Sequence, residues 1–404
     1  MKEHLDYVTA RDMLLDRVRP VGTERVPLEN CYGRVLAHDL TAPEDVPPFD
    51  RSPYDGYAFR AEDTSHASPD DPVTLRLLEE IPAGNVPTKA VTEGTAVKIL
   101  TGAPIPEGAN AVRMKEKTVF TDETVTLDAP ARPGENIIRT GEDMKKGDLI
   151  ARRGTRIDAG LMGTLAAQGG ARPEVYRRLR VGIISTGSEV TEADAPAAPG
   201  MIRNSNRYTL TAALLKEGMA PEYLGLTGDD RDAIAALIKF GAARCDAVLL
   251  TGGVSVGDHD LTPAAMETAG CETLFRGLAI KPGMACAYGL LDGKPVCGLS
   301  GNPASALTNF YLAALPALRA MAGLNEPVPH PVTLILRSAF KKKSPATRLL
   351  RGRLDLSDGR AGLILQGDQG NVVLSSTIGC DAMAIVPAGS GPLEEGTELK
   401  GFLI

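Results

Sequence analysis

The sequence predicts a multidomain protein that combines an α/β domain with β-rich domains. From residue 179 to about 322, strands alternate with helices, a pattern typical of a parallel sheet covered by helices. From about 57 to 145, many short strands follow one another without a helical pattern, which indicates a small β-rich domain. From Pro331 onward short strands resume, and they predict a small all-β C-terminal domain.

Within these segments the expected elements follow from apolar spacing and turn residues. The α/β segment is expected to contain the helices Asn206–Glu217, Arg231–Arg244, Thr262–Thr268 and Pro303–Ala322. The β-rich segment is expected to contain strands at Val73–Leu75, Thr95–Leu100, Ala111–Met114, Val125–Leu127 and Asn136–Ile138. The C-terminal segment is expected to contain strands at Val332–Leu336, Gly362–Leu365 and Ala382–Pro387.

Two helical patterns frame the β-rich segment. Apolar residues at helical spacing between Asp6 and Val18 predict one helix, and the Ala-, Leu- and Gly-rich stretch from Ile157 to Gln168 predicts another. We expect these helices to pair, so that the β-rich segment is an insertion between them. The proline-rich stretch from 43 to 57 is interpreted as a domain boundary followed by an ordered loop.

Composition excludes several classes of protein. The net charge of −7 provides no excess of positive charge for a phosphate backbone, so nucleic acid is not an expected partner. No apolar run reaches the roughly 18 residues of a membrane span, and residues 1–6 do not resemble a signal peptide. The six cysteines form no C-x-x-C pair and are interpreted as reduced core residues. A cytoplasmic protein without a membrane partner is expected.

Three glycine-containing loops follow predicted strands. They are 185–189, 251–260 and 298–303. Loops at the carboxyl ends of parallel strands line a common crevice. Because glycine has no side chain, the backbone of such a loop can come close to an anion and donate hydrogen bonds to it from its N–H groups. The three loops are therefore predicted to form one cleft.

Acidic residues in and near these loops indicate hard-cation chemistry. Carboxylates repel phosphate, so an anion site beside acidic residues is best explained by a divalent cation that binds both the carboxylates and the anion. The candidate oxygen ligands are Asp55, Asp143, Glu189, Asp229, Asp230, Asp258 and Asp260. Zinc spacing, a Walker A loop, a G-x-G-x-x-G loop and a G-x-S-x-G elbow are all missing from the sequence. The simpler alternative is that these acids cap helices or close turns; Asp229, for example, precedes the helix from Arg231.

Basic and hydroxyl residues complete the candidates. Lys281 follows a strand and precedes Pro282, and its alternative is a solvated strand end. Among Arg348, Arg351 and Arg353, Arg351 is the preferred contact for an oxyanion because Gly352 follows it. Thr101 lies on a proline-rich loop, where its hydroxyl would hold a phosphate or a pterin edge, or bond its own turn.

Seven sequence runs, in order, carry a resemblance to a known family. They are 52–58, 100–110, 141–143, 185–189, 202–206, 251–257 and 298–303. Together they resemble the signature motifs of the molybdopterin molybdenumtransferases, the MoeA proteins and the E domain of gephyrin. The match extends from about residue 5 to 390, and seven ordered motifs are far more specific than one glycine loop.

The resemblance implies an elongated, four-part subunit that forms a homodimer. The implied parts are a helical linker domain (5–26 and 146–178), an inserted β-rich domain (46–145), a three-layer molybdopterin-binding α/β domain (27–45 and 179–323) and a C-terminal β-barrel (324–404). It also implies the reaction, in which molybdate enters the dithiolene of adenylylated molybdopterin, the phosphoanhydride is hydrolysed, and AMP leaves with Mg²⁺ present. An adenylyltransferase and molybdoenzyme acceptors are implied partners.

Site residues follow motif by motif from the same resemblance. The implied catalytic residues are Asp55, Thr101, Asp143, Glu189, Asp229 and Asp260, of which Glu189, Asp229 and Asp260 would hold the metal. The implied substrate-binding residues are Gly187, Ser188, Ser205, Gly252, Gly253, Ser255, Asp258, Lys281, Gly301, Asn302, Pro303, Arg351, Ser375 and Ser376. Asp55 and Thr101 belong to the β-rich domain and are expected to reach the cleft of the other subunit. Molybdate is expected near Arg351, Ser375 and Ser376.

Three positions depart from the family pattern. Ser300 replaces a common proline, Met284 a common lysine, and Gly277 a lysine that some members carry. Each lost charged hydrogen bond would weaken anion binding by about 1–3 kcal/mol. A non-catalytic or tungstate-preferring paralogue or carrier is therefore an alternative. A sugar-nucleotide or phosphate enzyme is a further alternative, which explains the loops but not the β-domain motifs.

Overall fold

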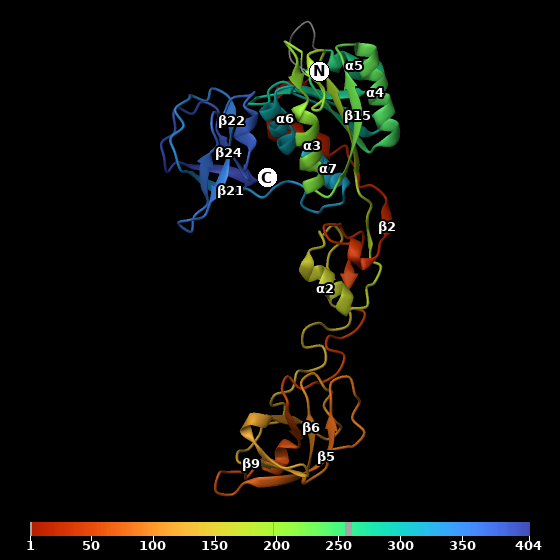
Figure 1. Ribbon diagram of the computed structural model, residues 1–404, viewed down its shortest axis with the longest axis vertical. Helices are drawn as coiled ribbons and strands as arrows, with labels where there is room; N and C mark the ends of the chain where they lie inside the picture. Colours follow the sequence, from red (N-terminus) through yellow and green to blue (C-terminus); the bar gives the residue numbers. More distant parts are fainter. Residues whose placement is uncertain (1, 197, 255–260) are drawn as a thin grey trace. The chain divides into compact units, whose positions relative to one another are not determined.

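The computed structural model describes residues 2–196, 198–254 and 261–404, and the chain divides into two compact units (Figure 1). Unit 1 consists of Met1–His38, Arg153–Ala159 and Arg172–Ile404. Unit 2 consists of Asp39–Arg152 and Gly160–Ala171. In the described part of the chain, no helix is long and apolar enough to cross a bilayer.

Unit 1 contains a mixed sheet of seven strands among the described residues. In spatial order the strands are β1 (Lys2–Leu5), β17 (Glu272–Leu278), β19 (Ala287–Leu291), β20 (Lys294–Leu299), β16 (Ala247–Thr251), β12 (Arg180–Thr186) and β15 (Ala220–Thr227). Neighbouring strands from β20 to β15 pair in parallel, as the alternation of strands and helices predicts.

Strand β19 is the exception to the predicted parallel sheet. It pairs antiparallel with both β17 and β20. Asp292 and Gly293, which separate β19 from β20, have φ values of 52° and 76°. Two central residues with positive φ form the tight turn that joins antiparallel neighbours, so this short turn reverses the chain where a crossover helix would have kept it parallel.

Helices cover both faces of this sheet. They are α3 (Ser205–Lys216), α4 (Arg231–Arg244), α5 (Thr262–Ala269), α6 (Pro303–Asn309), the π-helical turn η4 (Phe310–Ala314) and α7 (Leu315–Met321). Along β16, Leu249 belongs to the core with Phe310 and Leu318, whereas Val248 and Leu250 belong to the core beneath α4 and α5. Alternate strand residues thus serve two helix layers, which confirms the three-layer α/β prediction (Figure 1).

The N-terminal helix α1 (Tyr7–Leu15) packs into the same α/β core. Asp6 caps it by accepting hydrogen bonds from the N–H groups of Val8 and Thr9, at 3.1 and 3.0 Å. Its buried face, Ala10 and Leu14, joins the cluster that contains Phe310 and Leu318. This packing corrects the expectation that α1 pairs with the helix predicted at 157–168, which the structure places at α2 (Ala159–Ala167).

The C-terminal part of unit 1 is a closed five-stranded barrel. Its strands are β21 (Val332–Leu336), β22 (Thr347–Asp355), β23 (Gly362–Leu365), β24 (Ala382–Val386) and β25 (Glu398–Leu403). The order β22–β23–β21–β25–β24 closes through pairing of β22 with β24, which confirms the predicted barrel. The barrel joins the α/β core because β18 (Ile280–Lys281) pairs with β22, and because Leu349 and Met383 lie in the α/β cluster.

Short elements complete unit 1. They are β2 (Thr23–Arg25), β11 (Glu174–Tyr176), β13 (Val190–Thr191), β14 (Ile202–Arg203) and the 3-10 turns η1 (Leu28–Asn30) and η5 (Leu374–Thr377). Strand β2 pairs with β11, and β13 pairs with β14 directly beyond the end of β12.

Unit 2 is the β-rich domain that the short strand patterns predict. Its main sheet has the order β7 (Ala111–Met114), β4 (Gly56–Phe59), β6 (Thr95–Ile99), β5 (Val73–Ile81), β9 (Thr124–Leu127) and β8 (Val119–Phe120). Smaller elements are β3 (Leu40–Thr41), β10 (Leu149–Ala151), η2 (Ala61–Thr64), η3 (Lys115–Lys117) and α2. The strand expected at Asn136–Ile138 is wrong, since Ile138 forms only an isolated bridge with Arg51.

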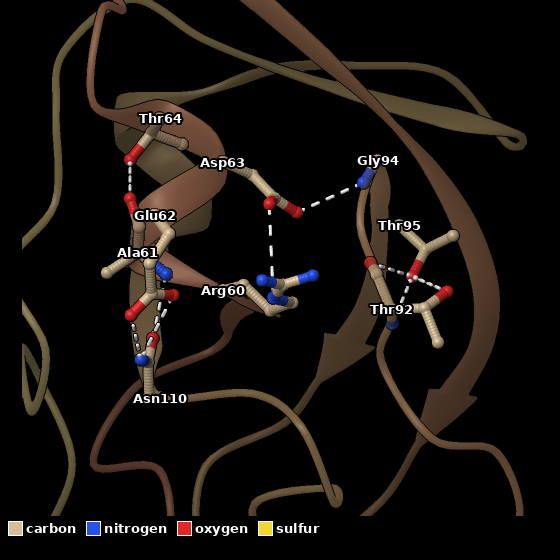
Figure 2. Close-up of polar contacts among 9 residues, drawn as sticks. All are labelled: Arg60, Ala61, Glu62, Asp63, Thr64, Thr92, Gly94, Thr95 and Asn110. Atoms are coloured by element: carbon tan, nitrogen blue, oxygen red, sulfur yellow. Dashed lines mark hydrogen bonds and ion pairs between the residues drawn. The ribbon is translucent and has the colours of Figure 1, made fainter.

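Polar contacts fix the turn η2 against its neighbours (Figure 2). The side chain of Asn110 accepts a 2.7 Å hydrogen bond from Ala61 N–H and donates to the Glu62 carboxylate. Asp63 accepts a 3.0 Å bond from Gly94 N–H. Asn110 ends one of the seven signature runs, so this motif position has a structural role within unit 2.

Candidate functional site

The three glycine loops line one pocket of about 700 Å³ in unit 1. They follow β12, β16 and β20, whose carboxyl ends lie at the same edge of the sheet. The residues expected at the site that line this pocket are Gly187, Glu189, Ser205, Asp229, Gly252, Gly253, Gly301, Asn302 and Pro303. Strand order alone predicts that these loops meet, and the structure brings them together.

The loop after β16 requires its glycines. Gly252 and Gly253 have φ values of 102° and 60°, in the region that favours glycine. A Cβ atom at Gly252 would lie 2.6 Å from the carbonyl oxygen of Thr186 on β12. Thr262 holds the loop, because its Oγ1 donates a 2.8 Å hydrogen bond to the Gly252 carbonyl. The backbone of this loop can therefore approach both the neighbouring loop and a ligand.

Asp229 is held by the first glycine loop. Its Oδ2 accepts a 3.0 Å hydrogen bond from Ser188 N–H, and its own N–H donates to Ser188 Oγ at 3.1 Å. The alternative that Asp229 caps the next helix is wrong. Asp230 caps α4, since its Oδ1 accepts from the N–H groups of Asp232 and Ala233 at 2.9 and 3.0 Å.

Glu189 and Asp229 supply carboxylate oxygens to the pocket, which is the donor type that Mg²⁺ prefers. Among the described residues, neither carboxylate forms an ion pair with Lys, Arg or His. The described residues also contain no group of three or more His, Cys, Asp or Glu side chains suited to a metal. Asp260, the third expected ligand, lies outside the described residues, as do Ser255 and Asp258. The two carboxylates fit a hard divalent cation but do not by themselves complete its coordination.

The N-terminus of α3 also lines the pocket through Ser205, and it favours an anionic ligand. Asn204 caps α3 by accepting a hydrogen bond from Arg207 N–H, and Ser205 is the first helical residue. Asn206 donates a 2.8 Å bond to the carbonyl of Gly301, whereas its buried Oδ1 has no partner among the described residues. Sequence reasoning named only Ser205 of this asparagine-containing run, although the run itself was visible as a motif.

A polar network extends from two lining residues of the pocket, Ser185 and Asn204, to residues outside the lining. Asn204 donates to Ser185 Oγ at 3.0 Å and to the Tyr223 hydroxyl at 3.3 Å. The Tyr223 hydroxyl donates a 2.5 Å bond to Glu192, which also accepts a 2.7 Å bond from Arg207. Burial, and then the Glu192 carboxylate, raise the pKa of Tyr223 well above its ordinary value, so the hydroxyl stays protonated. No sequence pattern indicated this network, because its members come from three separate segments.

Arg351 lies on the barrel strand β22 and is buried beneath the 370–376 segment rather than on the pocket surface. Its side chain is 0% exposed, and Nη2 donates to Ser376 Oγ at 2.9 Å and to the Gly370 carbonyl at 3.1 Å. Nη1 has no partner among the described residues. Ser376 is buried beside it, and Ser375 is exposed. The predicted oxyanion contact at these residues stays a prediction.

The departures from the family pattern now have a structural setting. Gly277 has a φ of 71°, and a Cβ atom there would lie 2.9 Å from the His4 ring, so a glycine has a local steric reason. Lys281 and Met284 are both exposed, and they are separated by Pro282 and Gly283. The peptide bond between Lys281 and Pro282 is cis. Neither Lys281 nor Met284 lines the pocket.

The remaining expected residues lie in unit 2. Asp55 Oδ1 accepts 2.7 Å hydrogen bonds from both the N–H and the hydroxyl of Thr101. These two bonds, the backbone bond first, hold the pKa of Asp55 below its ordinary value. Asp143 is exposed, and its N–H donates to the Val46 carbonyl. The structure thus brings Asp55 and Thr101 together, and no hydrogen bond among the described residues joins Asp143 to that pair.

The fold and the pocket define a multidomain α/β protein with an anion-adapted pocket at the carboxyl edge of its sheet. Family models match nearly the whole chain. The MoeA N-terminal region (domains I and II) matches residues 5–169, a probable molybdopterin binding domain matches 182–320, and the MoeA C-terminal region (domain IV) matches 333–401.

Individual relatives agree with these models. The chain is 38% identical to a molybdopterin molybdenumtransferase of Bacillus subtilis over 95% of this chain and 90% of that protein. It is 35% identical to the Staphylococcus aureus (strain COL) protein of the same name over 92% and 88%, respectively. A crystal structure of a Pyrococcus horikoshii molybdopterin biosynthesis MoeA protein matches with a TM-score of 0.86 and 34% identity over 100% of both chains. The chain belongs to the MoeA family.

Proposed function

We propose that this protein is a molybdopterin molybdenumtransferase that inserts molybdate into adenylylated molybdopterin. In this reaction water breaks the P–O–P bond of the adenylylated substrate, so AMP leaves and molybdopterin keeps its own phosphate. The observation that carries the proposal is the single pocket in which three glycine loops meet the Glu189 and Asp229 carboxylates. Relatives with the printed name molybdopterin molybdenumtransferase, matched over nearly the whole chain, support it.

Each pocket residue has a chemical role in this proposal. The N–H groups of the glycine loops and the N-terminus of α3 bind phosphate oxygens. Glu189 and Asp229, together with Asp260, would hold Mg²⁺, which neutralises charge that builds up on the leaving phosphate. The reciprocal hydrogen bonds with Ser188 keep Asp229 oriented toward the pocket. No protein nucleophile is required.

AMP release from adenylylated molybdopterin tests this proposal directly. The purified protein is assayed with Mg²⁺ and with molybdate present, absent or replaced by tungstate. We expect AMP release that requires the oxyanion, and its metal preference identifies the natural substrate. Tight pterin binding without AMP release under any of these conditions would contradict the proposal and favour a carrier.

Variants of the two carboxylates test their assigned roles. Glu189→Gln and Asp229→Asn should each lower AMP release by about 100-fold or more, because a neutral amide neither binds the metal well nor offsets its charge. The matched control is Asp232→Asn, which removes an exposed carboxylate three residues from Asp229 that forms a salt bridge with Arg231 and does not line the pocket. Full activity in both pocket variants would show that the assignment is wrong.

We further propose that the protein acts as a cytoplasmic homodimer, in which Asp55 and Thr101 act on substrate bound by the partner subunit. The adenylyltransferase of the same pathway would supply the substrate, and molybdoenzymes would receive the product. Membership of the MoeA family supports this part of the proposal.

Subunit mixing tests the dimeric arrangement. Asp55→Asn and Glu189→Gln are each expected to be inactive alone. If each site uses residues of both chains, each mixed dimer carries one intact site of two. Random exchange of an equal mixture makes about half of the dimers mixed, so about a quarter of parental activity should be recovered. A mixture of Glu189→Gln with Asp229→Asn is the control, since both changes lie in the same unit. No recovery in the first mixture, with exchange verified by mass spectrometry, would contradict action across subunits.

A further inference from the structure

The C-terminal segment supplies an aliphatic part of the pocket lining. Among the described residues, its contribution consists of Val372 and Leu374, whereas the α/β domain contributes the polar glycine loops, carboxylates and asparagines together with some aliphatic residues such as Val190 and Ile202. Val372 is 66% exposed and Leu374 is 37% exposed. We call these two side chains the apolar patch. Exposed aliphatic side chains in a pocket gain free energy when a ligand removes them from water.

The loop that carries the apolar patch is firmly held. Arg351 donates to the Gly370 carbonyl on one side of the patch and to Ser376 Oγ on the other, at 3.1 and 2.9 Å. Ser376 Oγ in turn donates a 2.5 Å bond to the Val373 carbonyl, between the two patch residues. A fully buried guanidinium therefore fixes both ends of a loop whose apolar side chains remain in the pocket.

The position of this loop is also set by the α/β core. The turn η5, which begins at Leu374, packs against α6, and α6 begins at Pro303 of the third glycine loop. The apolar patch is thus next to a loop that offers N–H groups to an anion. A ligand that fits both features carries a phosphate and, within reach of it, a flat ring whose face is poorly hydrated.

We propose that Val372 and Leu374 form the contact surface for a planar heteroaromatic ring of the substrate, so that the C-terminal barrel selects a ring-bearing phosphate over phosphate alone. Identification of that ring as adenine or pterin rests on the proposed function. The contact itself requires only a ring joined to a phosphate. Aliphatic side chains suit the faces of such rings, because they bury apolar area without demanding hydrogen bonds.

The test uses the full-length protein with Val372 and Leu374 both changed to serine. AMP and inorganic phosphate are the binding probes in titration calorimetry, and KM and kcat are measured for AMP release. The matched control is Ile378→Ser, which changes a 71% exposed aliphatic residue on the same segment that does not line the pocket. Leu374→Met keeps the apolar character and should keep parental affinity, while thermal melting checks that all variants fold.

We expect the double variant to lose about tenfold or more in affinity for the ring-bearing ligand, with phosphate affinity unchanged and Ile378→Ser within twofold of the parent. Weaker AMP binding assigns the patch to adenine; unchanged AMP binding with a tenfold higher KM for the intact substrate assigns it to pterin. If both quantities stay within twofold of the parent, or if phosphate affinity falls equally, the proposal is overturned. If the parent protein binds AMP but does not produce AMP from adenylylated molybdopterin, the proposed function is refuted. The binding test of the apolar patch still applies in that case.

Discussion

Neighbouring acidic residues in this protein have different roles, and only their hydrogen bonds distinguish them. Asp230 caps α4, whereas Asp229 bonds to Ser188 and lines the pocket. In the sequence both residues precede the same helix, so helix-capping rules apply to each. The position of each carboxylate relative to the helix decides which residue is the cap, because a capping side chain must reach the second and third N–H groups of its helix.

Glu217 shows how a charged residue can be buried for structural reasons. Its side chain is 8% exposed at the end of α3 and accepts hydrogen bonds from Arg319 at 2.6 and 2.9 Å and from Arg156 at 3.1 Å. Burial alone would raise the pKa of Glu217, but the Arg319 hydrogen bond and the charges of both arginines outweigh it and lower the pKa below 4.5. The carboxylate therefore stabilises the fold at neutral pH, and this contribution is lost as pH falls through the lowered value.

Replacement of Glu217 by Gln should lower the free energy of unfolding at pH 7 by about 1–3 kcal/mol, because two arginines lose their charged partner. The deficit should shrink as pH falls from the ordinary pKa of Glu through the lowered pKa of Glu217, because the parental carboxylate becomes protonated only over that range. Urea unfolding at several pH values measures both effects. Glu398→Gln, which breaks the exposed pair with Arg360, is the control and should cost less than about 1 kcal/mol. Equal losses in the two variants would contradict this account.

At the scale of elements, the regular helices and strands were predictable and the connections were not. The helix Arg231–Arg244 and the strands Val332–Leu336 and Gly362–Leu365 lie where apolar spacing places them. The direction of β19 depends on two turn residues, Asp292 and Gly293, which a reading based on strand and helix alternation overlooks. The partner of α1 depends on long-range packing, for which the apolar spacing of a helix contains no information.

The same limit applies to the site. Loops that follow parallel strands were recognisable because topology places their ends together. The apolar patch and the Asn204–Tyr223–Glu192 network depend on segments that approach only in the folded chain. Arg351 was identified as a candidate from its sequence context, but its burial beneath a loop was not visible there.

At the scale of the whole molecule, the two units have separate apolar cores. Phe59 lies in a cluster composed of unit 2 residues, and Phe310 lies in the main cluster of unit 1. Both side chains are fully buried. Because cooperativity depends on shared contacts, each unit is expected to unfold with its own transition.

Scanning calorimetry of single core variants tests this independence. Phe59→Ala should lower one transition temperature by roughly 10–20 °C and leave the other within about 2 °C, and Phe310→Ala should do the reverse. Leu215→Ile is the control, because it changes an exposed side chain and removes no buried volume, so both transition temperatures should stay at the parental values. A common shift of one merged transition in both variants would contradict independent unfolding.

The strand β1 has a consequence for how the chain is made. Residues 2–5 pair with Phe275 to Leu278, and the cluster that buries Leu14 is completed by Phe310 and Leu318. On the ribosome, β1 and α1 must therefore wait for their partners until synthesis has passed Leu278 and Leu318. Unit 2 has all its residues by Ala171 and can fold meanwhile. Residues 2–15 thus emerge before unit 2 but reach their native partners only after all residues of unit 2 have been made, so β1 and α1 are expected to stay unpaired during that interval.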